Sequence, residues 1–361
     1  MNLKLIEKLC CPKNVLGNVC NGPLLLNNNV FSVVYQTETE VTEGLLECSK
    51  CSELYPIISG VAVVLDNIKS WLRSNYYHIL SGAHQSGGIG SGLIVWLESF
   101  GWQLSNQPAN NYYEAPRWVN IFTATHYDNT PAGADDDSEV GRLVAGQTSV
   151  FDTVVEMLAT HLPAKLDKAL DVGTNVGGMA YRLSPFVHKV LALDTAFNVV
   201  LTARRIQKGY PEPITSYKRY MDGQYFDERL IAKTADNIEF MVASAAPPPA
   251  DQSYDLITVL NVIDCVPYPE QFLMSLIDVL NPGGFLLVTS PYSWGSDDVP
   301  VDRWMGASEE VSSSEAVLAL FAQHGLELLE ERDNVPWVLR EHKRWYRIFH
   351  NHCVLVRKPI K

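Results

Sequence analysis

The segment KALDVGTNVGG, residues 168–178, constrains the fold more than any other part of the sequence. A short apolar run ends in Asp171, a glycine cluster follows, and the chain continues in a pattern typical of a helix. The glycines are Gly173, Gly177 and Gly178. Glycine permits backbone angles and close ligand approach that a Cβ would block. The next apolar run ends in Asp194, 23 residues after Asp171, where a carboxylate binds ribose in nucleotide-binding βαβ units.

The glycine spacing distinguishes between nucleotide cofactors. Dinucleotide-binding folds use G-x-G-x-x-G, whereas this loop reads D-x-G-x-N-x-G. It resembles the D-x-G-x-G-x-G loop of S-adenosylmethionine (SAM)-dependent methyltransferases, with Asn175 at the middle glycine. The resemblance implies that SAM binds to Asp171, Gly173, Asn175, Gly177 and Asp194. The alternative is an ordinary α/β turn without a ligand.

Apolar runs of four to six residues alternate with helical patterns after residue 146, which predicts a parallel sheet covered on both faces. The predicted strands are Ala169–Val172, Val190–Asp194, Ile238–Val242, Leu256–Leu260, Phe285–Thr289 and Cys353–Val356; the predicted helices are 147–162, 177–183, 198–208 and 268–280. The N-P-G-G before the fifth strand and an antiparallel last strand resemble class I methyltransferases, which have a Rossmann-like, seven-stranded, mostly parallel sheet. The family has an acid after strand three; here Ser244 or a backbone group could replace it in binding the cofactor, and Asn261, after strand four, is a further expected cofactor contact.

Residues 1–66 have the cysteine layout of a separate small β-rich module. Two cysteine sites flank a β-rich stretch, and the second is a tight C-x-x-C, as in zinc ribbons. The segment resembles the small zinc-binding activator family that partners tRNA and protein methyltransferases. The predicted ligands are Cys11, Cys20, Cys48 and Cys51. Cys10 could replace Cys11, and a metal-free β module is the alternative.

Residues 67–145 are rich in aromatic residues and interrupted by glycines. We expect helical connectors that act as a lid over the cofactor cleft, with simple packing between domains as the alternative. His84, His126 and Tyr127 receive no role from the sequence. The domains expected are therefore 1–66, 67–145 and a methyltransferase domain, 146–361.

Three stretches should reach the C-terminal edge of the sheet, where ligands bind in such folds. They contain N-x-I-D after strand four, T-S-P-Y-x-W after strand five, and a P-W-V-L-R-E run before the last strand; a W-x-G motif lies at Trp304–Gly306. Over residues 165–357 these motifs resemble the methyltransferase domain of ovothiol biosynthesis, which methylates a side-chain imidazole nitrogen of 5-thiohistidine. The function expected is therefore N-methylation of a small imidazole compound.

Imidazole is mostly neutral and nucleophilic at neutral pH, so catalysis needs control of its tautomer more than a strong base. We expect Asp264 to accept the N–H of one ring nitrogen while the other attacks the methyl group. The alternative is that Asp264 caps the next helix. Tyr292 and Trp294 could form walls around the ring, Arg340 could bind a substrate carboxylate, and His352 could face the pocket.

Composition sets the remaining expectations. The chain has 361 residues and a net charge of −13, which disfavours nucleic acid as a partner. Its sequence contains neither a run of 18 apolar residues nor a signal-peptide pattern, so we expect no membrane partner and a cytoplasmic location, as a monomer or a homodimer. Two other functions stay open: methylation of another small molecule or a protein side chain, and a non-catalytic SAM-fold partner protein.

Overall fold

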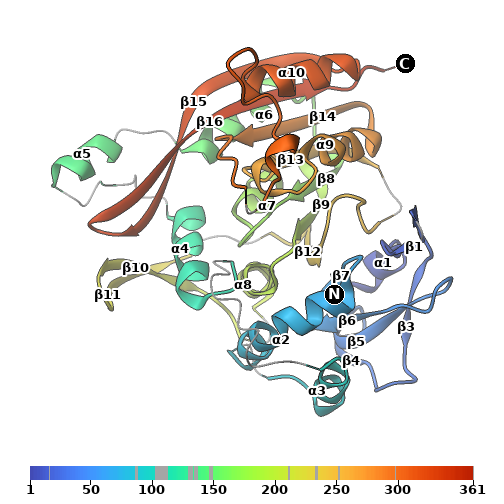
Figure 1. Cartoon of the computed structure of the whole chain (residues 1–361). Helices are drawn as coiled ribbons and strands as arrows, with labels where there is room; N and C mark the ends of the chain where they lie inside the picture. Colours follow the sequence, from blue (N-terminus) through green and yellow to red (C-terminus); the bar gives the residue numbers. More distant parts are fainter. Residues whose placement is uncertain are drawn as a thin grey trace.

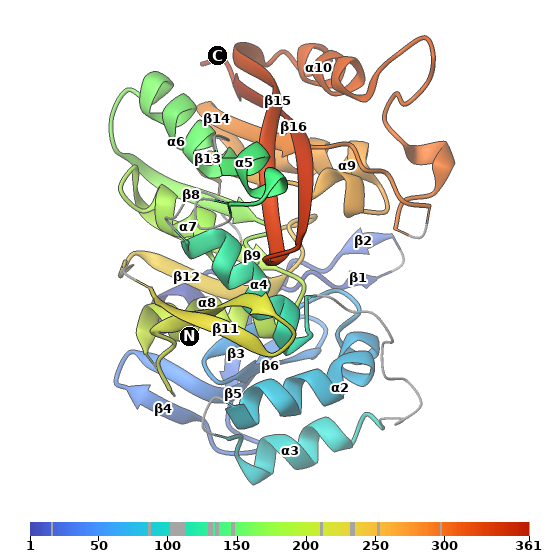
Figure 2. The same cartoon turned by 90° about the vertical axis from the view of Figure 1, so that its left-hand side faces the viewer.

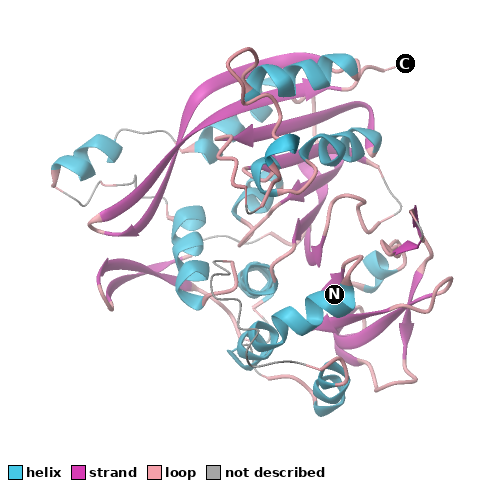
Figure 3. Cartoon of the chain, viewed as in Figure 1, coloured by secondary structure: helices cyan, strands magenta, loops and turns pink. Residues whose placement is uncertain are grey.

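The computed structural model describes residues 1–15, 17–85, 88–101, 113–128, 133, 137–145, 149–209, 212–231, 235–250, 253–296 and 298–360 (Figure 1). Within these residues a sheet of twelve strands forms the middle layer, and helices flank it (Figure 3). No helix among the described residues combines the length and the apolar character that a membrane crossing requires.

Seven strands in the order β12-β9-β8-β13-β14-β16-β15 form the part of the sheet that carries the glycine loop. Their bounds are β8 Leu166–Val172, β9 Val187–Asp194, β12 Ile238–Ala243, β13 Tyr254–Leu260, β14 Leu280–Ser290, β15 Glu327–His342 and β16 Trp345–Arg357. Strands β8, β9, β12, β13 and β14 pair in parallel, and β16 is antiparallel to β14. Five parallel strands and an antiparallel last strand were predicted, and both predictions are confirmed.

Helices cover both faces of this sheet because its central strands are apolar on both sides; Leu170, Ile257 and Leu287 are fully buried. The helices are α6 Val150–His161, α7 Gly178–Leu183, α8 Phe197–Lys208, α9 Pro269–Asp278 and α10 Ser313–Gln323, with short 3₁₀ turns at Ile263–Cys265 and Val301–Arg303. The four predicted helices are therefore present within a few residues of their expected ends, residues 147 and 148 lying outside the described part.

The segment 67–145 contributes helices, as expected: α2 Ile68–Gln85, α3 Ser91–Glu98, α4 Pro116–Tyr127 and α5 Glu139–Ala145. Two of its aromatic residues, Trp102 and Tyr112, lie outside the described residues. Helix α4 contacts β10, β15, α7 and α8, so it lies against the half of the molecule that carries the glycine loop.

Two hairpins were not predicted. One is β10 Ser216–Asp222 with β11 Tyr225–Leu230; the other is β15 with β16. Figure 2 shows the β15–β16 hairpin running from the end of the chain down to α4. The β10–β11 hairpin, most of β15 and the first half of β16 are partly exposed and carry many charges, so they lack the apolar alternation by which buried strands are predicted. The buried half of β16 contains the predicted strand Cys353–Val356.

The N-terminal segment forms α1 Leu3–Ile6 and a group of short strands: β1 Asn14–Val15, β2 Asn18–Val19, β3 Leu24–Asn27, β4 Val34–Thr37, β5 Glu40–Cys48, β6 Leu54–Ile58 and β7 Val61–Val64. Strand β7 pairs in parallel with β12, Val63 opposite Val242 and Val64 opposite Ala243. The N-terminal strands therefore extend the central sheet at its β12 edge instead of forming a detached sheet.

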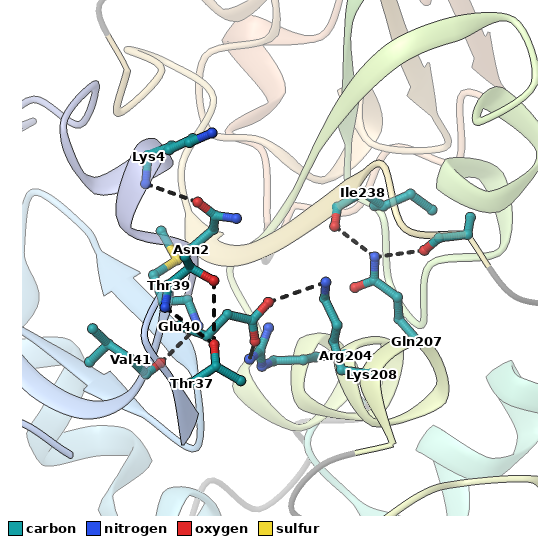
Figure 4. Close-up of polar contacts among 12 residues, drawn as sticks. Asn2, Lys4, Thr37, Thr39, Glu40, Val41, Arg204, Gln207, Lys208 and Ile238 are labelled. Carbon is teal, nitrogen blue, oxygen red and sulfur yellow. Dashed lines mark hydrogen bonds and ion pairs between the residues drawn. The ribbon is translucent and has the colours of Figure 1, made fainter. Parts of the chain in front are cut away.

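Ion pairs strengthen this junction (Figure 4). Glu40, at the start of β5, contacts Arg204 at 3.0 Å and Lys208 at 3.2 Å, both on α8. Arg204 is almost fully buried, and a buried guanidinium needs such a partner because an unpaired buried charge is costly. On the same helix Gln207 donates to the carbonyl of Ile238 at the start of β12. Helix α8 thus holds the N-terminal strands and β12 together.

Candidate functional site

The glycine loop between β8 and α7 takes the backbone conformation its sequence predicts. Gly173 and Gly177 have φ of +71° and +86°, the left-handed region that glycine enters at little cost. Space is also limiting: a Cβ at Gly173 would lie 2.2 Å from Val262, and one at Gly177 would lie 2.8 Å from Phe240. Both positions therefore require glycine for conformation and for packing.

Asn175 occupies the middle position of the loop with φ +51°. Asparagine is one of the few residues other than glycine that adopts this conformation readily, so it can replace the glycine seen in related loops. Its side-chain Oδ1 is buried, with no hydrogen-bond partner in the described part of the chain. A buried acceptor without a donor is costly, and a polar ligand in the loop would supply one.

Two carboxylates at strand ends adjoin the loop, and Asp194 bonds to its backbone. Asp194, at the end of β9, accepts the backbone N–H of Asn175 at 2.9 Å and that of Ala196 at 3.0 Å. Asp171 accepts the hydroxyl of Thr258 at 2.8 Å, and burial raises its pKa to about 6. A carboxylate has about four acceptor sites, and the backbone N–H groups of Asn175, Thr195 and Ala196 use three of those of Asp194, which leaves about one for a donor such as a ribose hydroxyl.

Helix α4 braces the loop from the other side, through residues to which the sequence assigned no role. The backbone N–H of Gly178 donates to Nδ1 of His126 at 3.1 Å, and the Tyr127 hydroxyl donates to the carbonyl of Val176 at 2.7 Å. A Cβ at Gly178 would lie 2.5 Å from that histidine nitrogen. The third glycine of the loop is therefore needed so that α4 can approach.

Tyr113 and Glu114, just before α4, both lie near Asp194, and Tyr113 also lies near Asp264. Glu114 is fully buried and accepts the backbone N–H groups of Phe197 and Asn198 at the start of α8, and burial raises its pKa to about 7. Burial also raises the pKa of Tyr113, and the charges of Asp194 and Asp264 add to that shift. This part of the connector therefore lies near the strand ends; no local sequence pattern indicated it.

The two other predicted cofactor residues follow β12 and β13. The Ser244 hydroxyl accepts the backbone N–H of Ala246 at 3.2 Å, within its own turn. Asn261 has φ +55° and accepts the Thr289 hydroxyl through Oδ1 at 2.9 Å, which leaves its amide N–H₂ group as a donor toward a ligand.

Asp264 lies in the 3₁₀ turn after β13 and is 3% exposed. Its Oδ2 accepts the backbone N–H of Ser293 at 2.8 Å, while its buried Oδ1 has no partner among the described residues. Burial raises the pKa of this carboxyl. Helix α9 begins after Tyr268 without a side-chain cap, so the alternative role of Asp264 as the cap of that helix is wrong.

Tyr292, Trp294 and His352 lie together at the end of β14. The rings of Tyr292 and Trp294 stack at 26° with centroids 6.3 Å apart. His352 starts far along the chain but pairs with Ser290 because β16 runs antiparallel to β14, and its Nδ1 lies 2.8 Å from the Tyr292 hydroxyl. Because Ser293 binds Asp264, the predicted catalytic pair and two predicted substrate residues form one group.

Three of the eight non-glycine residues with positive φ in the described part of the chain lie at this edge. Asn175, Asn261 and Tyr292 follow the adjacent strands β8, β13 and β14, and all three have positive φ. For an aromatic residue this conformation is a genuine outlier that costs on the order of 1–2 kcal/mol. Strained residues often occur at binding and catalytic sites, so Tyr292 is a candidate functional residue.

Arg340 lies elsewhere. Arg332 of β15 and Thr289 of β14 both pair with Cys353 of β16, so they lie at the same level of the sheet. Arg340 is eight residues further along β15, which is about 26 Å at 3.3 Å per residue. Its side chain contacts Met221 of β10 at 3.4 Å and lies over the Tyr346 ring. Glu341 pairs with Arg347. The fold thus does not bring Arg340 to the group formed by Asp264, Tyr292 and His352.

The four predicted cysteine ligands do come together. The sulfur atoms of Cys11, Cys20, Cys48 and Cys51 all lie within 4.8 Å of one another. The Cys11–Cys51 and Cys20–Cys48 sulfur distances are both 3.6 Å. Sulfur atoms around a tetrahedral zinc ion, at about 2.3 Å each, would be about 3.8 Å apart. The cluster contains Cys11 and not Cys10, and its geometry fits a zinc ion.

Comparisons with known proteins bear on this site. The profile of a family described as a methyltransferase domain matches residues 145–331, just over half of the 361 residues. A curated relative, the mitochondrial ubiquinone biosynthesis O-methyltransferase of Dictyostelium discoideum, is 25% identical over 150 residues, which are 41% of this chain and 43% of that protein. The match therefore spans less than half of the relative's length.

Solved structures of similar fold include the N-methyltransferase NodS from Bradyrhizobium japonicum WM9 in complex with S-adenosylhomocysteine, at 14% identity and a TM-score of 0.39, covering 69% of this chain and 100% of that one. The [4+2]-cyclase SpnF is also 14% identical, with a TM-score of 0.43, covering 69% of this chain and 94% of that one. The family match over residues 145–331, the strand order and the glycine loop show that the chain belongs to the methyltransferase domain family and carries a class I SAM-dependent methyltransferase domain.

Proposed function

We propose that this methyltransferase transfers the methyl group of SAM to an imidazole nitrogen of a small histidine derivative, 5-thiohistidine being the compound that its motifs favour. The observation that carries the proposal is the carboxylate of Asp264. It is buried at the strand ends, one oxygen is fixed by the Ser293 N–H, and the other oxygen has no donor in the described part of the chain. Such an oxygen is suited to accept a ring N–H from a substrate.

The chemistry requires little more than orientation. SAM supplies an electrophilic methyl group, and most of the catalysis lies in positioning the attacking atom. An imidazole that donates one N–H to Asp264 must present the lone pair of its other nitrogen. The same carboxylate then stabilises the positive charge that develops on the ring. The neighbouring stacked pair, Tyr292 and Trp294, supports this reading because it offers an aromatic wall to a flat ring.

For the methyl donor, we propose that the glycine loop binds the methionine part of SAM and that Asp194 accepts its ribose hydroxyls. The positive φ at Gly173, Asn175 and Gly177 and the remaining acceptor site of Asp194 support this assignment. Asn261 can donate its amide N–H to the same ligand.

A second candidate is transfer to an oxygen atom. It is favoured by the curated relative, which is named an O-methyltransferase. A buried carboxylate without a donor can also accept a hydroxyl proton, so Asp264 alone does not separate the two reactions. The remaining candidate, a SAM-fold protein without catalysis, predicts no methylated product from any acceptor.

We further propose that the four-cysteine cluster holds a structural zinc ion. The geometry leaves no place for an open catalytic ligand, since four thiolates complete a tetrahedral site. The cluster joins the loops at Cys11, Cys20 and Cys51 to Cys48 at the end of β5, in the N-terminal segment that extends the sheet beside β12, so the metal would stabilise that segment and take no part in methyl transfer.

The test is a mass-spectrometric screen with SAM carrying a heavy methyl group. Acceptors are histidine, 5-thiohistidine, short histidine peptides and small phenols, each with the wild-type chain and with Asp264→Asn. The proposal predicts a heavy methyl group on a ring nitrogen of an imidazole acceptor, formed by the wild-type chain only. Methylation of phenols alone would favour the oxygen reaction. No product, together with no S-adenosylhomocysteine binding by calorimetry up to millimolar concentration, would favour the non-catalytic protein.

A further inference from the structure

The strand order indicates where the adenine base of the cofactor lies. In the proposed function the methionine part of SAM binds at the loop after β8, and the ribose binds at Asp194, at the end of β9. The next strand in the order is β12, and the three strands run parallel. A ligand that extends in one direction across the strand ends therefore has its base over the end of β12, which Ser244 follows.

Helix α2 lies along this edge of the sheet. It begins just after β7, the strand on the other side of β12, and it contacts α8. Gly82, near the other end of α2, is packed against Asn198 in the first turn of α8, since a Cβ on Gly82 would lie 2.0 Å from Oδ1 of that asparagine. The helix therefore crosses from the end of β7 to the start of α8.

Trp71, in the first turn of α2, reaches the residue that follows the ribose-binding acid. Its Nε1–H donates to the carbonyl of Thr195 at 3.1 Å. Val63 of β7 and Asp194 of β9 both pair with Val242 of β12, so β7 and β9 end at about the same level, two strand spacings or about 10 Å apart. An indole that makes this hydrogen bond from a helix beginning beside β7 must span the end of β12.

The helix holds Trp71 firmly while leaving part of its ring open. Ile68 and Leu72, on either side of Trp71, are each 2% exposed, and Nδ2 of Asn75 donates to the carbonyl of Trp71 at 3.0 Å. The Trp71 side chain itself is only half-buried. A fixed aromatic ring with open surface at the strand ends is suited to contact a flat ligand.

The loop after β12 also fits a base. Residues 244–250 read SAAPPPA, which is apolar apart from Ser244. The N-terminal segment holds the far end of this loop: the backbone N–H of Cys10 donates to the carbonyl of Pro249 at 2.8 Å, and Leu9 forms a β-bridge with Ala250. Residues that precede the methyltransferase domain therefore support both the loop after β9 and the loop after β12.

We propose that the indole of Trp71 forms a wall of the adenine site; this rests on the proposed binding of the methionine part of SAM at the glycine loop and of its ribose at Asp194. The single N–H of the indole is used by Thr195, so the ring meets the base through its apolar surface and not through a hydrogen bond. Stacking of a base on an aromatic ring contributes strongly to affinity. Trp71 thus sets the affinity for the nucleoside and not the choice of methyl acceptor.

The binding test uses calorimetry with two ligands, S-adenosylhomocysteine and S-ribosylhomocysteine, which lacks the base. Trp71→Ala and Trp71→Phe are compared with the same substitutions at Trp304, whose indole also donates to a backbone carbonyl, that of Val299 at 2.9 Å, but in the segment after β14. We expect Trp71→Ala to raise the Kd of S-adenosylhomocysteine by about 10-fold or more and to leave that of S-ribosylhomocysteine unchanged. Trp71→Phe should lose less, and the Trp304 variants should bind both ligands as the wild type does.

An unchanged affinity of Trp71→Ala for S-adenosylhomocysteine would overturn the proposal. So would an equal loss for both ligands, because it would show that Trp71 only holds the Thr195 loop in place. If the wild-type chain binds no S-adenosylhomocysteine, the cofactor assignment and the role of Trp71 fail together.

A second measurement does not depend on the stability of the alanine variant. In nitrogen NMR of protein labelled in its indole groups, the signal that is missing from Trp71→Phe belongs to Trp71. It should shift when S-adenosylhomocysteine binds and stay in place with S-ribosylhomocysteine, while the Trp304 signal stays in place with both. A Trp71 signal that does not respond to saturating S-adenosylhomocysteine would overturn the proposal. If Trp71 responds as expected and no imidazole acceptor is methylated, the proposed acceptor is wrong and the adenine site stands.

Discussion

The backbone N–H of Asn175 donates a 2.9 Å hydrogen bond to Oδ2 of Asp194. The acid at the end of β9 therefore fixes the loop that follows β8, and the two sequence features from which a nucleotide site was predicted are physically joined. The same carboxylate also accepts the N–H of Ala196. Asp194 thus stabilises the loop conformation in addition to its predicted contact with ribose.

This relationship predicts the effect of Asp194→Asn. The amide offers one acceptor oxygen in place of two and lacks the charge, so we expect the dissociation constant of S-adenosylhomocysteine to rise by about 10-fold or more, which corresponds to about 1.4 kcal/mol. Calorimetry measures this directly, with Asp278→Asn on the exposed end of α9 as the control. An unchanged affinity would remove Asp194 from the cofactor site.

Asn175 allows a test of the loop conformation. With φ at +51°, Asn175→Gly should leave the free energy of unfolding within about 0.5 kcal/mol of wild type, whereas Asn175→Ala should lower it by about 1–2 kcal/mol. Urea unfolding monitored by circular dichroism distinguishes the two variants. Equal stability of the glycine and alanine variants would contradict the left-handed conformation.

The parts of the fold that the sequence predicted are those with buried, periodic apolar residues. Strands such as β9 and β13 and the amphipathic helix α8 were found because their burial imposes a pattern on the sequence. The hairpin β10–β11, the strand β15 and the first half of β16 were missed because their residues are partly exposed and include Pro336 and many charges, whereas the buried strand Cys353–Val356 of β16 was predicted. Their pairing depends on a partner strand and not on a local pattern.

In the candidate site, too, the residues that were predicted are those that a local sequence pattern specifies. Asp194 and Asp264 were found because acids at the ends of predicted parallel strands must meet at one edge. His126, Tyr127 and Glu114 were missed because their contacts depend on where α4 packs, which no local spacing encodes. Arg340 was grouped with the substrate residues, but the length of β15 carries it away from them.

His126 predicts a pH dependence of stability. Burial, and then the charge of Arg182, lower the pKa of His126 to about 3 from 6.5. The folded state keeps the ring neutral while the unfolded state binds a proton below pH 6.5, so stability is fully present above that pH and falls as the pH drops toward 3. The slope is at most about 1.4 kcal/mol per pH unit. Urea unfolding at pH 7 and pH 5 measures the loss.

The comparison variant is His126→Asn, whose Oδ1 can accept the Gly178 N–H but does not titrate. It should be less stable than wild type at pH 7, because it loses packing against Phe151, and the difference should shrink at pH 5. A difference that stays constant with pH would show that His126 is not kept neutral by the fold.

The cysteine cluster predicts about one zinc ion per chain. Cys48→Ser should reduce the metal content to near zero and lower the free energy of unfolding, since structural zinc binding is coupled to folding. Cys10→Ser is the matched control, because Cys10 is adjacent to Cys11 and outside the cluster. Elemental analysis of the purified proteins gives the answer, and zinc loss in the Cys10 variant or its retention in the Cys48 variant would contradict the assignment.

The most direct test of the account is the turnover of Asp264→Asn measured beside its cofactor binding, with exposed Asp302→Asn as the control. The proposed role of the Asp264 carboxylate predicts S-adenosylhomocysteine affinity equal to wild type within about threefold, and a kcat for the imidazole acceptor lower by about 10²–10⁴-fold. The control should match wild type in both. An Asp264→Asn variant that binds S-adenosylhomocysteine and methylates the imidazole acceptor at the wild-type rate would contradict the role given to the Asp264 carboxylate.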